Sequence, residues 1–175
     1  IALAQMQAFL SSYGVFSLGM EVSAAAMLVA IPAIAFMIIA VPAGLLSNKI
    51  GRKNTQIVGL VGYAIGALVI YFFPTATMLN IGLLICGLTW PLANVVQVAM
   101  IVDSAPVETL MGPYTGLRQI AVTLGFIIGP ILGGTLVEAM GNDYRWVWLI
   151  MFVFLVLATV AILPVTKGEA KKEMA

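Results

Sequence analysis

Polar and aromatic side chains recur at helical spacing inside one long apolar stretch of the sequence. Trp90, Asn94, Gln97 and Ile101 follow one another at intervals of four, three and four positions, which places them on one face of an α-helix. Amide side chains can bind hydroxyl groups, and an indole ring offers a surface for stacking. The face therefore predicts a solute-binding surface. The other interpretation is a hydrogen bond between neighbouring helices, which polar groups need at membrane depth.

Three further polar residues are candidates for the same surface. Gln5 lies near the start of the chain, and Gln119 and Thr123 lie one helical turn apart in a later apolar stretch. We expect all three to add polar groups to the cavity that Trp90 faces. No Asp or Glu falls near the centre of an apolar stretch, so the sequence gives no evident site for a coupling proton or sodium ion.

Glycines repeat at every fourth position between residues 125 and 134. Gly125, Gly129 and Gly133 share one helix face, and Gly134 follows the last of them. Small residues at this spacing let two helix backbones approach closely in a membrane. Pro130 lacks a backbone N–H and is expected to kink the helix. The segment predicts a packing seam with a bend, and we hypothesise that the bend acts as a gate.

A short basic turn separates two of the apolar stretches. Its glycines permit a tight turn, and its basic side chains are expected to hold it on the cytoplasmic side of a membrane. The residues of this turn that we single out are Gly44, Asn48, Lys49, Gly51, Arg52 and Lys53.

The composition indicates that these residues belong to a membrane protein. Of 175 residues, 62% are hydrophobic and 9% are charged, and the mean hydropathy is +1.12. A soluble domain carries about a quarter charged residues, so these charges cannot solvate a globule. One Cys and no His exclude a disulfide within the chain and make a Cys/His zinc site implausible. No pairing of nucleophile and base or phosphate-binding loop is present, so we expect no enzymatic activity.

Long apolar stretches divide the chain into one partial span, five full spans and a charged tail. Continuous apolar runs of about 20 residues are typical of membrane-spanning helices. We therefore predict an all-α fold, a polytopic transmembrane helical bundle over residues 1–163, with a tail over residues 164–175. Residues 1–13 are interpreted as the second half of a span, and the full spans are expected at residues 24–47, 55–73, 78–102, 114–137 and 145–163.

The basic residues gather on one side of this bundle. Only Arg145 falls on the opposite side, near aromatic residues such as Tyr71 and Trp146. The positive-inside rule then predicts a cytoplasmic C-terminus. Arg118 is interpreted as a group at the membrane interface, like the acidic residue Asp103. The basic residues on the predicted cytoplasmic side are Lys49, Arg52, Lys53, Arg118, Lys167, Lys171 and Lys172.

The order of spans, the charge pattern and the two glycine motifs resemble a six-helix half of a major facilitator superfamily transporter over essentially the whole chain. In that family the loop signature Gly-x-x-x-Asp-Arg/Lys-x-Gly-Arg-Arg/Lys latches the transporter in one state. Here Asn48 stands where the signature has its acidic residue. The resemblance implies that residues 44–53 form such a latch without that ion pair.

Finer resemblances point to different subfamilies. Residues 87–94 and 103–117 look like the tenth and eleventh helices of glycoside–pentoside–hexuronide-type and sucrose-type cation symporters, and the tail resembles their C-termini. This implies the C-terminal half of such a transporter. Residues 125–134 also resemble a signature in the fifth helix of antiporters. The N-terminal half of a drug antiporter is therefore the alternative.

We expect secondary active transport of a small polar solute, a sugar or glycoside, with a coupled proton or sodium ion, by alternating access in the plasma membrane. The expected partners are the solute, the ion, the lipid bilayer and the missing N-terminal half of the transporter. No cofactor, metal or nucleic acid is expected. Two alternatives remain: drug/proton efflux, and a non-transporting membrane scaffold or truncated fragment.

Overall fold

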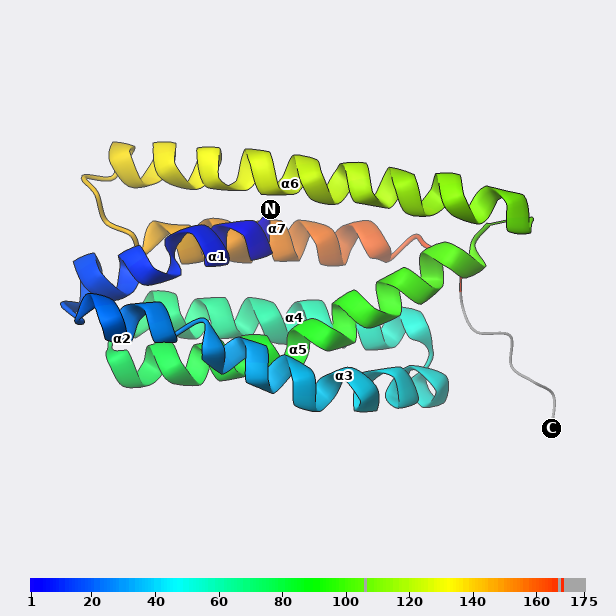
Figure 1. Ribbon diagram of the computed structural model, residues 1–175, viewed down its shortest axis with the longest axis horizontal. Helices are drawn as coiled ribbons and strands as arrows, with labels where there is room; N and C mark the ends of the chain where they lie inside the picture. The colour runs from blue at the N-terminus through cyan, green and yellow to red at the C-terminus, as the bar shows by residue number, and fades with distance from the viewer. Residues whose placement is uncertain (106, 167, 169–175) are drawn as a thin grey trace.

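The computed structural model describes residues 1–105, 107–166 and 168, and these residues form helices joined by short turns, without a strand (Figure 1). Two of the helical elements are single turns of π and 3₁₀ type, at Tyr13–Ser17 and Glu108–Leu110. The α-helices in chain order are α1 (Ala2–Ser12), α2 (Val22–Met27), α3 (Ala30–Ile50), α4 (Arg52–Phe72), α5 (Ala76–Asp103), α6 (Met111–Ala139) and α7 (Trp146–Ile162).

Four helical segments are long and apolar enough to cross a membrane. They are Val22–Ile50, which joins α2 to α3, and the helices α4, α5 and α6. The apolar helix α7 has 17 residues, which is at the short end of the range of about 17–25 that a span needs. The predicted all-α helical bundle is confirmed, and each full span expected from the sequence overlaps one of these four segments or α7.

Proline and glycine set the helix boundaries at the start of the bundle. Pro32 has no N–H to donate to the carbonyl of Leu28, which instead accepts from the N–H of Ile31 at 3.3 Å. Pro32 therefore accounts for the irregular turn between α2 and α3. Gly51 alone joins α3 to α4, at a φ of +89°. A side chain would be strained there, so the turn predicted from the sequence depends on this glycine.

The helices form one bundle in which α5 contacts α3, α4 and α6. α5 packs most extensively on α4 and then on α3, while α7 lies against α4 and α1, and α6 lies against α1. Figure 1 shows α6, α1 and α7 on one side and α3, α4 and α5 on the other. The start of α4 and the ends of α5 and α7 meet at one end, which we call the basic end because Arg52 and Lys53 lie there. α6 begins at the same end.

Glycines on α4 set how closely α4 and α5 approach. A Cβ atom on Gly59 would lie 2.5 Å from the backbone nitrogen of Ala93, and one on Gly66 would lie 2.6 Å from Sγ of Cys86. On the opposite side of α5, a Cβ on Gly87 would lie 2.6 Å from Cα of Pro32 in α3. These glycines therefore hold α5 in backbone contact with both of its neighbours.

The glycine face predicted on α6 lies against α1. A Cβ on Gly129 would lie 3.1 Å from Cβ of Ala4, and one on Gly133 would lie 2.5 Å from the ring of Phe9. Gly125 faces Ile1 in the same way, and Gly134 lies near the Phe9 ring. α6 continues through Pro130 as a single helix.

We predict that Gly59→Val destabilises the bundle. The valine side chain would overlap the backbone of α5, and overpacking of this kind costs about 1–3 kcal/mol. The measurement is the thermal unfolding midpoint of the full-length protein in detergent. Gly116→Val is the matched control, because no atom lies within 4 Å of a Cβ at Gly116. Equal midpoints for the two variants would contradict the close approach of α4 and α5.

Candidate functional site

A cavity of about 930 Å³ opens between α4, α5, α6 and α7 and extends from the start of α1 toward the basic end. α5 contributes Trp90, Asn94, Gln97 and Ile101 to its wall. The remaining wall is largely apolar, with side chains such as those of Leu60, Phe126 and Leu155. The structure thus brings the four residues of the predicted α5 face to one cavity.

Trp90 is held in place by a buried tyrosine. Its ring lies against that of Tyr63 in α4, with 5.3 Å between the ring centroids and a tilt of 40°. The hydroxyl of Tyr63 is buried and donates to Sδ of Met6 in α1 at 3.3 Å. Trp90 also lines a second, mostly apolar cavity of about 380 Å³ between α1, α3 and α5. The indole therefore forms part of the walls of both cavities.

Asn94 is hydrogen-bonded to a basic residue of α6. Nη2 of Arg118 donates to Oδ1 of Asn94 at 3.3 Å, and both side chains are partly buried and line the large cavity. The guanidinium and the Asn94 amide can both donate to a bound solute. The arrangement is suited to binding. Among the described residues, no group of three or more His, Cys, Asp or Glu side chains could hold a metal ion.

The other predicted cavity residues lie elsewhere. Gln5 is fully buried between α1 and α6, and its Nε2 donates to the carbonyl of Gly129 at 3.4 Å. Its Oε1 is buried without a hydrogen bond in the described part of the chain. Gln119 and Thr123 are exposed and do not line either cavity. The structure therefore does not bring these three residues together with Trp90.

Arg118 lines the cavity, a role that its interpretation as a group at the membrane interface did not include. A sequence signal could have placed it. Arg118 precedes Gly125 by seven positions and Gly129 by eleven, so all three share one helix face. Because that glycine face packs inside the bundle, Arg118 points inward as well. Gln119 lies about 100° further around the helix and is exposed.

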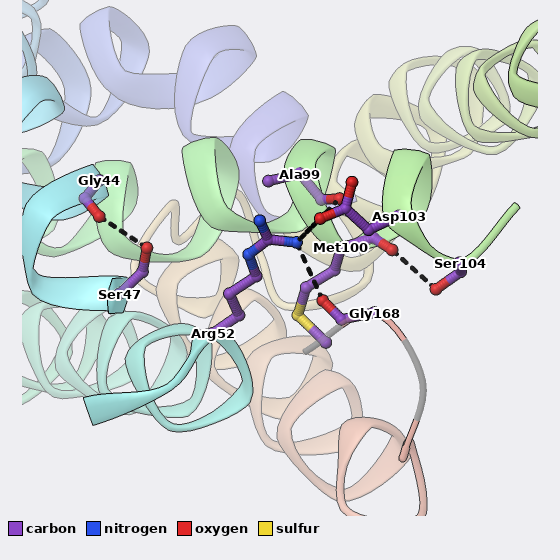
Figure 2. Close-up of polar contacts among 8 residues, drawn as sticks. All are labelled: Gly44, Ser47, Arg52, Ala99, Met100, Asp103, Ser104 and Gly168. Atoms are coloured by element: carbon purple, nitrogen blue, oxygen red, sulfur yellow. Dashed lines mark hydrogen bonds and ion pairs between the residues drawn. The ribbon is translucent and has the colours of Figure 1, made fainter. Parts of the chain in front are cut away.

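At the basic end, Arg52 connects three segments of the chain. Figure 2 shows its guanidinium between α5 and the segment after α7. Nη1 forms an ion pair with Asp103 and donates to the carbonyl of Ala99 at 3.4 Å and to that of Gly168 at 3.1 Å. The side chain of Arg52 is 16% exposed and that of Asp103 is 46% exposed. Solvent screens a pair this open, so it is worth at most about 1 kcal/mol.

Some of the other residues of the basic turn form hydrogen bonds, and others are exposed. Nζ of Lys53 donates to the carbonyl of Leu163 at the end of α7, and the carbonyl of Gly44 accepts from Oγ of Ser47 at 2.7 Å. Asn48 and Lys49 are exposed. The turn is thus tied to the ends of α5 and α7 by its last two basic residues.

Gly168 fits against the end of α5 because it has no side chain. Its φ is +84°, and a Cβ there would overlap the carbonyl of Met100 and lie 2.7 Å from Oγ of Ser104. Ser104 itself donates to that Met100 carbonyl at 2.7 Å, as Figure 2 shows. No sequence signal predicted this contact, since Arg52 binds Gly168 through a backbone carbonyl.

Comparison with known proteins gives a family match over almost the whole chain. The family model described as Major Facilitator Superfamily matches residues 1–174. The matched region contains the cavity, the glycine face of α6 and the basic turn.

Individual relatives align over part of this chain. An uncharacterized MFS-type transporter of Methanocaldococcus jannaschii is 32% identical over 62% of this chain. A class H tetracycline resistance protein of Pasteurella multocida is 39% identical over 53% of it, and the chicken (Gallus gallus) facilitated glucose transporter member 1 of solute carrier family 2 is 31% identical over 72%. The aligned parts cover 28%, 23% and 26% of those proteins. The aligned part of the chain thus spans about a quarter of the length of each relative.

We predict that Gly168→Ala releases the segment after α7 from the end of α5. The added methyl group would overlap the Met100 carbonyl, and the left-handed backbone would be strained. Amide hydrogen exchange of the full-length protein should become about five- to tenfold faster around residue 104, which corresponds to losing about 1 kcal/mol. Gly112→Ala is the control, because a Cβ there meets no atom within 4 Å. Unchanged exchange around residue 104 would contradict the docking of Gly168.

Proposed function

Since the chain belongs to the Major Facilitator Superfamily, we propose that it is one half of a transporter that moves a small polar solute, a sugar or glycoside, together with a coupled cation across the plasma membrane. Membrane transport in general is supported by the family and by the names of the relatives. The chain is an integral membrane protein, in agreement with its four long apolar helical segments.

The observation that carries the proposal is the polar strip inside the 930 Å³ cavity. Asn94 and Gln97 offer amide donors and acceptors of the kind that bind sugar hydroxyls, and Trp90 offers a face on which a sugar ring can stack. A mostly apolar cavity with a few convergent polar groups is the usual form of a small-molecule site. The relative named as a facilitated glucose transporter favours a sugar-sized solute.

The basic end supplies a contact that can open and close. Arg52 joins the start of α4 to the end of α5 and to Gly168, and Lys53 joins it to the end of α7. In alternating access two halves of a transporter rock around a central site. We propose that these contacts hold the cytoplasmic side in one state, with the C-terminus in the cytoplasm.

We predict that Asn94→Ala and Gln97→Ala each raise KM for the transported sugar about fivefold or more, with little change in the maximal rate. Each amide would contribute one hydrogen bond to the bound solute, worth about 1 kcal/mol, and loss of such uniform binding appears in KM. The measurement is uptake of radiolabelled glucose by the full-length protein in proteoliposomes under an imposed proton or sodium gradient.

The matched control is Asn80→Ala, because Asn80 is an exposed amide on the same helix, outside both cavities. This variant should keep the KM of the unmodified protein. If both cavity variants keep that KM as well, the proposed binding face is wrong. Uptake that persists without either gradient would contradict cation coupling.

Drug/proton efflux is the second candidate. It is favoured by the glycine face at residues 125–134 and by two relatives that are named as a tetracycline resistance protein and an efflux transporter. Expression of the full-length protein in a drug-sensitive strain separates the two functions. Raised tetracycline resistance without gradient-driven glucose uptake would establish efflux and exclude the sugar proposal.

A further inference from the structure

Among the described residues that line the large cavity, Arg118 is the one with an ionised side chain, and that side chain is not fully hydrogen-bonded. Arg118 reaches the cavity from α6 and donates from Nη2 to Asn94. Its Nε is buried and has no hydrogen-bond partner among the described residues. A guanidinium carries five N–H donors in a planar fork. Arg118 therefore has more donors than the described residues use, in a partly water-excluded space.

Among the described residues, none that lines the cavity offers a counter-charge to Arg118. The described residues that line the cavity include no Asp and no Glu. The carboxylate of Asp103, at the end of α5, is engaged by Arg52 at the basic end. Because a cation is costly to keep in an apolar, partly buried setting without an anion, the cavity has an electrostatic preference for a negatively charged occupant.

The position of Arg118 on α6 argues against a purely interfacial role. It shares the face of Gly125 and Gly129, which packs inside the bundle, and residues on the neighbouring face, such as Leu117 and Ile120, are exposed. A residue that served only to anchor the helix end would have no need to contact Asn94. The hydrogen bond to Asn94 joins Nη2 of Arg118 to a second residue of the cavity wall.

We propose that Arg118 binds an anionic group, a carboxylate or a phosphate, on the transported solute. The guanidinium donates to two oxygens of the anion in the bidentate geometry that these groups favour. Oδ1 of Asn94 holds Arg118 in position while the amide NH2 of Asn94 donates to the solute, and Trp90 and Gln97 contact the uncharged remainder. This proposal rests on the transport function proposed above and specifies the charge of its substrate.

The test compares three sugars that differ in one substituent. Uptake of radiolabelled glucuronate, glucose 6-phosphate and glucose is measured with the full-length protein in proteoliposomes. The kcat/KM of each anionic sugar is then divided by the kcat/KM of glucose. We expect one of the two anions to be preferred over glucose by about tenfold or more, which is the effect of one charge-assisted hydrogen bond or a stronger contact. The two anions distinguish a carboxylate site from a phosphate site.

Two variants remove the anion site in different ways. Arg118→Gln removes the charge, and Asn94→Asp places a carboxylate beside Nη2 of Arg118, where it neutralises the guanidinium. Both should abolish the preference for the anion. Arg118→Lys keeps the charge and should keep part of the preference. Asn80→Asp adds an exposed carboxylate to the same helix outside the cavity and should keep all of it.

The outcomes separate this proposal from the transport function itself. If the protein carries glucose as well as or better than both anions, or if Arg118→Gln retains the anion preference, the anion site is wrong while sugar transport stands. If none of the three sugars enters, the proposed sugar transport is contradicted and the anion site falls with it. Because Asn94→Asp retains Arg118, it remains informative where Arg118→Gln does not insert or fold.

Discussion

Close contact between helix backbones is the constraint on which the rest of the structure depends. Lipid removes the hydrophobic drive that brings helices together in water, so helices in a membrane associate by packing at short range. α5 is in such contact on two sides, with Gly59 and Gly66 of α4 on one and with Pro32 of α3, through Gly87, on the other. With these two sides occupied, the face of Trp90, Asn94 and Gln97 is left to line the cavity.

The basic end uses a different kind of interaction from the glycine seams. Arg52 contacts Asp103 and the Gly168 carbonyl from the start of α4, but the carboxylate is half exposed and the ion pair is correspondingly weak. Glycine seams change little when the ends of helices move, whereas a solvent-screened ion pair can be broken at small cost. Close packing within the bundle and weak contacts at one end are compatible with the rocking between two states that is proposed above.

Hydropathy and residue spacing predicted the fold well, because each is a property of a single helical segment and can be read without knowing the neighbouring helices. An apolar run of about 20 residues fixes a span, and a repeat of four fixes the face of Gly125, Gly129 and Gly133. Spacing cannot identify the partner of that face, which is α1. Polarity alone also does not place Gln119, which is exposed and lies about 100° around the helix from Arg118. Gly168 was missed because a backbone carbonyl acceptor has no signature in the sequence.

The number of basic residues on each side of the membrane predicts the orientation of the chain, but it does not assign a role to each residue, as Arg118 shows. Arg118 is one of the basic residues that predict the orientation of the chain. It lies about 10 Å along the axis of α6 from the first residue of that helix. A long side chain at that depth can extend either toward the helix end or into the bundle. The neighbouring helix decides between these directions, because Asn94 offers an acceptor on the inner side. One residue can therefore satisfy the positive-inside rule and still set the charge of the cavity.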